Sequence, residues 1–346
     1  MTPSLARILG ERSRAMPKPI RWFTLPQLFR YERQQRGRLR EHYQWNVDIV
    51  GEEGVAADAE VLAVAIDALR ELGLTAGDFR ARVSDRRLLA AVLASCGISE
   101  GGMAAAFAVV DKMEREPREA SAAKLVGQCG LDATQADDVL ALFEVVGLDG
   151  VTERFGSDPI VAVELERLSA YVGILQAMGL GDFVEVDLKI VRGLAYYTGI
   201  VFELFDRKGE LRAICGGGRY DRLLELVGGD PLPAVGFGMG DVVLGELLSD
   251  RGLWPEYRRS VDYYVVVIGE EQRSVASGLA HALREKGHSV VYALKEQSVR
   301  KQFKAAETEG ARSVLILGPD EAAKGVVVMR DMETGTEREV PVGELQ

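Results

Sequence analysis

The chain has 346 residues, of which 47% are apolar and 27% are charged, a globular composition long enough for two or three domains. No charge-free apolar run of about 18 residues occurs, so no membrane span is expected, and the net charge of −11 argues against nucleic-acid binding by the protein as a whole. Three scattered cysteines and a start without an apolar signal region indicate a reduced, cytoplasmic protein with neither a disulfide framework nor a zinc site.

The first 40 residues differ in charge from the rest of the chain. They carry ten lysine and arginine residues against Glu11 and Glu32, a net charge of +8, which leaves −19 for the remainder. A solvated basic surface is the commonest meaning of such a cluster. The residue pattern inside the segment favours a binding surface instead.

Residues 20–50 are predicted to form a long β-hairpin, with arms at 20–33 and 41–51 and a loop at 34–40. Because side chains alternate between the two faces of a strand, the second arm has a polar face and an aromatic and aliphatic face, and we expect the latter to be core. Pairing of the arms would create a polar surface bearing Arg30, Glu32, His42, Gln44 and Asp48. A wet sheet face explains the alternation too, but these residue types are better suited to directional hydrogen bonding.

Further along the chain, apolar spacing predicts a helix at 56–74, a helical module at 86–160 and another helix at about 161–178. Strands are expected at 183–192, 199–206 and 211–215, and a second glycine-rich run, 236–240, precedes a helix. After a linker at 252–260, strands alternate with helices, which predicts a small α/β domain with a mostly parallel sheet.

Two further patterns have chemical character. Tyr196 and Tyr197 follow Arg192 and are flanked by glycines, although a tyrosine pair in a core is an equally good interpretation. The run 216–218 consists of three glycines, which would allow either a tight turn or a close approach to the backbone, but neither glycine run has P-loop spacing. Because the chain has only three histidines, we expect its chemistry to depend on arginine electrostatics, as in phosphoryl and nucleotidyl transfer.

Several of these segments together resemble a known family. Residues 29–44 resemble motif 2 of the class II aminoacyl-tRNA synthetases in its histidine-specific form, and 192–203 and 216–221 resemble the two histidine-specific signatures. The resemblance implies an α+β class II catalytic domain, an antiparallel sheet flanked by helices, formed by residues 1–85 and 161–251. It further implies a helical insertion at 86–160, the linker at 252–260 and an α/β anticodon-binding domain at 261–346.

The resemblance also implies an activity: activation of L-histidine with ATP and Mg²⁺ to give histidyl-adenylate, and transfer of the histidyl group to tRNA(His), without a protein-held metal. Arg30 and Arg192 would be catalytic, at the α-phosphate. ATP would be bound by Arg30, Glu32, Arg38 and His42. Histidine would be bound by Thr2, Gln44, Asp48, Arg192, Tyr196 and Tyr197, with Asp48 near the amino group and the tyrosines around the imidazole. Arg300, Lys301 and Lys304 are candidate tRNA contacts, with a solvated helix face as the alternative.

The chain departs from the family pattern in two places. Residues 1–7 resemble the interior of the family's Arg-Pro-Glu-x-Thr segment, so motif 1 and its dimer contacts would precede them, and residues 238–244 lack the usual motif 3 arginine over the adenine and γ-phosphate. Two alternatives follow. One is a non-catalytic paralogue, such as a histidine-binding regulatory subunit of a phosphoribosyltransferase, and the other is a tRNA-binding module without catalysis. The family otherwise implies a homodimer.

Overall fold

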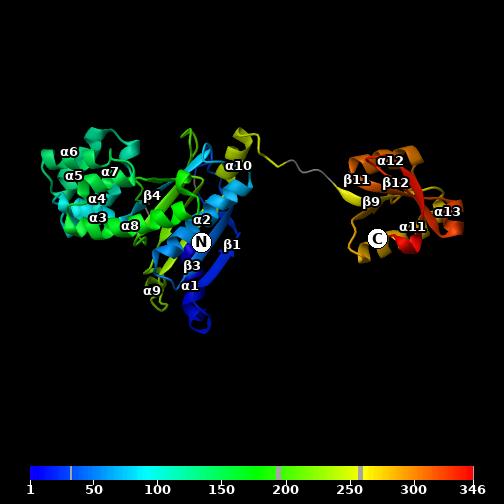
Figure 1. The fold of residues 1–346 in the computed structure, drawn as a ribbon, viewed down its shortest axis with the longest axis horizontal. Helices are drawn as coiled ribbons and strands as arrows, with labels where there is room; N and C mark the ends of the chain where they lie inside the picture. The colour runs from blue at the N-terminus through cyan, green and yellow to red at the C-terminus, as the bar shows by residue number, and fades with distance from the viewer. Residues whose placement is uncertain (32, 192–195, 256–259, 346) are drawn as a thin grey trace. The chain divides into compact units, whose positions relative to one another are not determined.

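The computed structural model describes residues 1–31, 33–191, 196–255 and 260–345. The chain divides into two compact units, Met1–Trp254 and Pro255–Gln346 (Figure 1). No helix in the described residues is long and apolar enough to cross a membrane.

The described part of the first unit is built on an eight-stranded sheet in the order β1-β3-β8-β7-β6-β4-β5, with β2 paired to β3 beside β1. The strands are β1 Ile20–Thr24, β2 Gln27–Phe29, β3 Glu41–Val50, β4 Phe79–Asp85, β5 Val184–Val186, β6 Ile200–Asp206, β7 Cys215–Arg219 and β8 Ala234–Gly240. All neighbours are antiparallel except β4 and β5. The sheet is therefore of the antiparallel type expected from the family resemblance.

The predicted hairpin is confirmed, but its first arm is divided. β1 and β2 both pair with β3, and the break between them falls at Leu25 and Pro26, where proline cannot donate a ladder hydrogen bond. The 34–40 loop contains a tight turn in which the backbone N–H groups of Gln35 and Arg38 donate to each other's carbonyl oxygens at 3.1 and 2.9 Å. Gly37, with φ of +70°, supplies the left-handed residue of that turn.

The burial of β3 confirms the predicted core face at its inner end and shows that the polar face is buried there too. Ile49 is buried as expected, but Tyr43 on the same face is 48% exposed, whereas Asn46 and Asp48 on the polar face are buried. Trp45 on the expected core face is only partly buried, against the main core. The polar face of this strand is therefore recessed within the protein, whereas the outer end of the aromatic face is exposed to solvent.

The glycine run 216–218 is part of a strand, not a turn, and the strand predicted at 211–215 instead begins at Cys215. β7 lies between β6 and β8, and all five of its residues are buried. A Cβ on Gly217 would lie 2.5 Å from the carbonyl oxygen of Gly236 and 2.7 Å from side-chain atoms of Phe202 and Phe237. Only glycine fits at this position of the core face.

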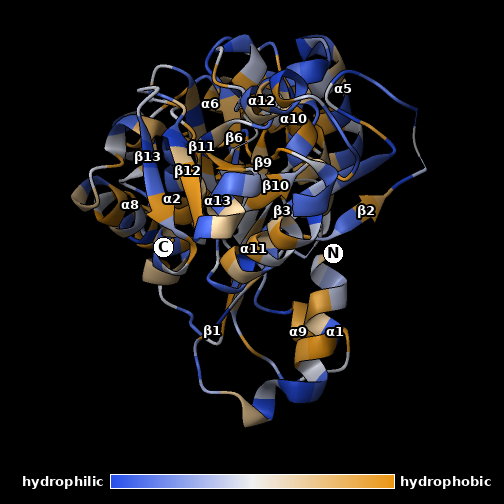
Figure 2. Ribbon diagram, turned by 90° about the vertical axis from the view of Figure 1, so that its right-hand side faces the viewer, coloured by the Kyte–Doolittle hydropathy of each residue, from blue (hydrophilic) through white to orange (hydrophobic). Residues whose placement is uncertain are grey.

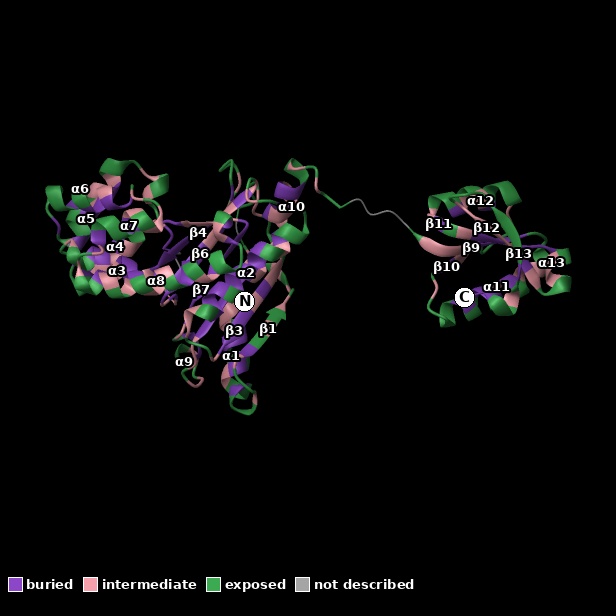
Figure 3. Ribbon diagram, viewed as in Figure 1, coloured by how far each residue is buried: buried purple, intermediate pink, exposed green. Residues whose placement is uncertain are grey.

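Helices cover the sheet on both faces. The core face packs against α2 Val55–Glu71, α8 Pro159–Ala177 and α10 Asp241–Asp250 (Figure 3). Residues 86–160, all described, contain five α-helices up to the start of α8: α3 Arg86–Ser95, α4 Met103–Val110, α5 Arg118–Cys129, α6 Ala133–Leu142 and α7 Leu148–Phe155. α3 begins where the Asp85 carboxylate accepts hydrogen bonds from the N–H groups of Arg87 and Leu88, an N-cap that joins the module to the end of β4.

A smaller cluster lies on the other face, where α1 Thr2–Arg12 packs against α9 Leu223–Leu226 (Figure 2). Leu5, Leu9 and Leu224 join Tyr197 and Tyr220 in this cluster. The start of α1 is thereby brought to the polar side of the sheet.

The second unit has a five-stranded sheet in the order β10-β9-β11-β12-β13 among its described residues. Its elements are β9 Val261–Val267, α11 Arg273–Glu285, β10 Val290–Tyr292, α12 Val299–Thr308, β11 Ala311–Leu317, α13 Pro319–Lys324, β12 Val326–Asp331 and β13 Glu337–Pro341. β9 runs parallel to β10 and β11, whereas β12 and β13 are antiparallel, so the sheet is mixed and not mostly parallel as expected.

Gly217→Ala is expected to lower the free energy of unfolding of the first unit by about 2–3 kcal/mol, because the new methyl group meets backbone and ring atoms that cannot move aside. Urea denaturation followed by tryptophan fluorescence measures the change. Gly173→Ala on the exposed side of α8, where no atom lies within 4 Å of the new Cβ, is the control and should raise stability by up to about 1 kcal/mol. Equal effects of the two substitutions would contradict this account of β7.

Candidate active site

The recess on the polar face exists because β8 has glycines opposite the polar residues of β3. Asp48 pairs in register with Gly236 and Asn46 pairs with Gly238. A Cβ on Gly236 would overlap the Asp48 carboxylate, and one on Gly238 would lie 2.5 Å from Nε2 of Gln44. The polar side chains of β3 therefore occupy the space over β8, where Gly236 and Gly238 have no side chains of their own.

Asp48 is the buried acid of this recess. It is 5% exposed, and the phenol of Tyr220, which is also buried, donates a hydrogen bond to Oδ1. Burial raises the pKa of Asp48 from 3.8 to about 6, against the opposing effect of the Tyr220 hydrogen bond. The amino group of Met1 is close enough to lower this pKa as well, so the predicted ligand Thr2, at the start of α1, comes from the same side.

Tyr220 connects this carboxylate to two further tyrosines. The Tyr196 and Tyr197 rings have centroids 4.8 Å apart, and Tyr196 meets Tyr220 edge-on at 6.0 Å. The two predicted tyrosines are thus joined to Asp48 through Tyr220, which the sequence reasoning did not select. Its signal was present, because Tyr220 follows the triple glycine in the second signature.

Arg219 connects the chain segments that carry Asp48 and Tyr220. Its guanidinium group is buried and bonds the Asp58 carboxylate of α2 at 2.7 Å. It also donates to the carbonyl oxygens of Glu52 and Gly54, at 3.0 and 3.3 Å, and to Asp221 at 3.1 Å. The turn after β3 and the end of β7 are therefore fixed to each other, and with them Asp48 and Tyr220.

The outer end of the hairpin is cationic. Arg30 donates from Nε to the carbonyl oxygen of Leu39 at 2.7 Å, which holds its side chain along the loop. Burial, followed by the charges of Arg30 and Arg38, lowers the pKa of His42. His42 is therefore neutral at pH 7, and its buried Nδ1 has no hydrogen-bond partner among the described residues.

The loop itself is held on α10. The N–H of Gly37 donates to Glu246 at 3.0 Å, and Arg36 pairs with Glu246 at 3.3 Å and Asp250 at 3.7 Å. These contacts fix the position of Arg38, which lies in the same turn.

Not every predicted residue can be placed. Glu32 and Arg192 lie outside the described residues. The structure brings Gln44 to the polar face, where its Nε2 donates to Asn46 Oδ1 at 2.6 Å. Among the described residues, no group of three or more His, Cys, Asp or Glu side chains could hold a metal ion.

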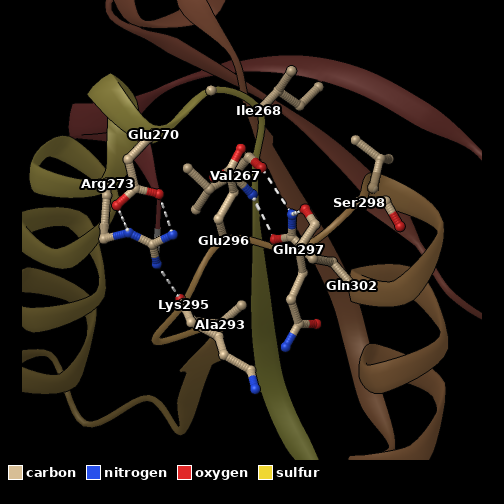
Figure 4. A pocket seen from close by; sticks show the side chains of 12 residues that line it. Val267, Ile268, Glu270, Arg273, Ala293, Lys295, Glu296, Gln297, Ser298 and Gln302 are labelled. Atoms are coloured by element: carbon tan, nitrogen blue, oxygen red, sulfur yellow. Dashed lines mark hydrogen bonds and ion pairs between the residues drawn. The ribbon is translucent and has the colours of Figure 1, made fainter.

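The second unit has a crevice of about 130 Å³ at the carboxyl ends of β9 and β10 (Figure 4). Gln302 forms part of its wall, accepting a hydrogen bond from the Val267 N–H at 2.9 Å and donating to the carbonyl oxygens of Val267 and Gln297 at 2.8 and 2.9 Å. β9 has parallel neighbours on both sides, so the crevice lies at the point where strand order reverses, the usual place for ligands in open α/β sheets. Arg300, Lys301 and Lys304 are exposed on α12, the helix that also carries the crevice residues Val299 and Gln302.

Comparison with known proteins adds independent findings. A family model described as histidyl-tRNA synthetase matches residues 1–240, and one described as anticodon binding domain matches 262–346. The chain is 43% identical to the histidine–tRNA ligase of Opitutus terrae over all of this chain and 80% of that protein. It is 38% identical to the chloroplastic/mitochondrial histidine–tRNA ligase of Arabidopsis thaliana over all of this chain and 70% of that one. The crystal structure of histidyl-tRNA synthetase from Nostoc superposes with a TM-score of 0.77 at 24% identity, covering 97% of this chain and 79% of that chain.

The raised pKa of Asp48 makes a prediction for stability. Ionisation of this carboxyl costs more free energy in the folded protein than in the unfolded chain, because the folded pKa is the higher one. The folded protein is therefore destabilised fully above pH 6, and this destabilisation disappears as the pH falls from 6 toward 4. Asp48→Asn should therefore be more stable than wild type at pH 8, by at most about 3 kcal/mol, with a difference that shrinks toward pH 4. Thermal unfolding at several pH values tests this, with the exposed Asp67→Asn as control. A difference between wild type and Asp48→Asn that does not change with pH would contradict the burial of this charge.

Proposed function

The chain belongs to the histidyl-tRNA synthetase family, and from this we infer that it is a histidine–tRNA ligase, which activates L-histidine with ATP and transfers it to the 3′ end of tRNA(His). One observation carries the proposal beyond family membership. A buried carboxylate bonded to a tyrosine lies on the same face of β3 as His42, which is close to the arginines of the hairpin loop. The carboxylate and its tyrosine suit an imidazole ligand, and the arginines of the hairpin loop suit a triphosphate.

We propose that histidine lies on the glycine floor of β8 between Asp48 and the tyrosines. The Asp48 contact with Tyr220 favours the imidazole ring, and not the amino group, as the partner of Asp48. Gln44 and Thr2 would then bind the amino acid's own amino and carboxylate groups. Such a pocket rejects apolar analogues strongly, because they would leave its buried polar groups unpaired.

ATP would occupy the cationic side of the recess. Arg30 would bind the α-phosphate and the histidine carboxylate, with Arg192 as a second cation there, and Arg38 would face the terminal phosphates. Glu32 would contact adenine, and a neutral His42 can stack on a base without adding charge repulsion to the nearby arginines. ATP would enter with Mg²⁺ bound to its phosphate oxygens, the ordinary mode for this ion.

The proposed reaction is an in-line attack of the histidine carboxylate on the α-phosphorus. The carboxylate oxygen forms a bond to phosphorus as the bond to pyrophosphate breaks, giving histidyl-adenylate. Arg30 and Arg192 would stabilise the negative charge that develops on the α-phosphate oxygens. The 3′-terminal ribose hydroxyl of tRNA would then attack the histidyl carbonyl and release AMP.

We propose that the second unit binds the anticodon at its crevice. The crevice offers backbone and amide hydrogen-bonding groups. These groups are held in place because the Gln302 amide is hydrogen-bonded to the backbone of both Val267 and Gln297. Splayed anticodon bases expose the edges that such groups recognise, and the cations of α12 would bind phosphates beside them.

A homodimer is proposed as the assembled form. Phe23 and Phe29 are each 72% exposed and Tyr31 is 96% exposed, all from the β1–β2 arm at the edge of the sheet. Exposed aromatic side chains are typical of protein–protein interfaces. A second copy of the chain would cover them, in agreement with the family pattern. A cytoplasmic location is proposed on the composition alone.

Histidine-dependent ATP–pyrophosphate exchange is the direct test of the function. The intact chain is expected to exchange with histidine, and Arg30→Gln should lower kcat at least about a hundredfold, because one charge at the reacting phosphate is lost. Arg12→Gln, another exposed arginine of the basic segment, is the control. Histidine binding without exchange would favour the regulatory paralogue, and exchange with a different amino acid would overturn the substrate assignment.

The anticodon proposal predicts a separable effect. Substitution of Arg300, Lys301 and Lys304 together by alanine should raise the KM for tRNA in aminoacylation about tenfold while leaving pyrophosphate exchange unchanged, because only phosphate contacts to RNA are lost. Lys324→Ala on α13 serves as the control. An unchanged KM for tRNA would show that these residues are merely a solvated helix face.

A further inference from the structure

Arg212 is presented toward the hairpin loop by a rigid connection between β6 and β7. The buried carboxylate of Asp206 accepts hydrogen bonds from the N–H groups of Glu210 and Leu211, at 3.2 and 3.0 Å. On the other side of Arg212, the Ile214 N–H donates to the Leu204 carbonyl oxygen at 2.8 Å. The backbone is thus fixed immediately before and shortly after this residue.

The Arg212 side chain lies over the hairpin loop. Its Nη2 donates to Oε1 of Gln35, and its Cδ lies 3.6 Å from the point that a Cβ on Gly37 would occupy. The same point is 3.2 Å from Cγ2 of Val243, in the first turn of α10. Three segments distant in sequence meet here, and Arg38 belongs to the same turn as Gln35 and Gly37.

Among the residues that the structure describes, the charge of Arg212 has no counter-ion. Within the described ranges its hydrogen-bond partner is the neutral amide of Gln35, and no carboxylate lies within ion-pair distance. The nearby acids on α10, Glu246 and Asp250, pair with Arg36 instead. A fixed guanidinium group held by an amide, next to further arginines, is suited to a polyanion, because a multiply charged ligand offsets the mutual repulsion of the cations.

We propose that Arg212 is a phosphate-binding residue that receives the terminal phosphates of ATP. It brings a cation beside Val243, in the turn of α10 that contains no arginine of its own. The inference rests on the proposed function, because it assigns one further residue to the ATP site. The same chemistry could serve a tRNA phosphate, and the experiment separates the two sources.

Calorimetric titration of the full chain with ATP and, separately, with AMP tests the proposal. Arg212→Ala should raise the Kd for ATP about tenfold and leave the Kd for AMP unchanged, because AMP lacks the terminal phosphates. Arg212→Lys, which keeps the charge without the forked geometry, should fall between Arg212→Ala and wild type. Lys208→Ala, an exposed cation of the same connection, is the control and should bind both nucleotides as wild type does.

Three results would overturn the proposal. Equal weakening of ATP and AMP binding would make Arg212 a structural support of the loop, and unchanged binding of both would remove it from the site. A raised KM for tRNA with unchanged ATP binding would assign the residue to RNA. Failure of the proposed function is distinguishable, because wild-type protein would then lack histidine-dependent exchange whatever the nucleotide titrations show.

Discussion

The site depends on keeping a carboxylate buried on the face of a β-sheet, which is costly unless neighbouring groups satisfy it. The Asp48 carboxylate meets this constraint because the Tyr220 hydroxyl donates a hydrogen bond to it. Gly236 also leaves room for it, since any Cβ at that position would collide with the carboxylate. The buried Arg219–Asp58 ion pair then fixes the strand end that carries Tyr220. The one buried charge is thus accommodated by a phenol on one side and by bare glycine backbone on the other.

The same sheet face has two electrostatic halves, and this division suits a two-substrate reaction. Around Asp48 the groups are acidic or phenolic and well buried, whereas around the hairpin loop they are guanidinium groups closer to solvent. An imidazole and a polyphosphate would be drawn to opposite ends of the recess, and their reacting atoms would meet between them near Arg30. The arginines of the hairpin loop belong to the cationic first 40 residues of an otherwise acidic protein.

Local patterns of the sequence predicted the hairpin, the helices and the polar row of β3, because alternation and apolar spacing depend only on neighbouring residues. They did not predict that the polar row would be buried as well, since burial depends on which strand lies alongside, and Gly236 and Gly238 are on a strand almost 200 residues away. Arg212 was missed for the same reason, because its partner Gln35 is distant in sequence, whereas Tyr220 lies within the second signature and could have been selected. The triple glycine was assigned to a turn or close approach, although the absence of side chains is equally useful inside a crowded sheet.

The central claim is that the buried Asp48 carboxylate receives the substrate's ring. A crystal structure of the protein with L-histidine bound tests it most directly. We expect an imidazole nitrogen within hydrogen-bonding distance of Asp48, with the Tyr220 hydroxyl beside it and the ring enclosed by Tyr196 and Tyr197. A histidine whose ring points away from these residues, with Asp48 still bonded only to Tyr220, would contradict it.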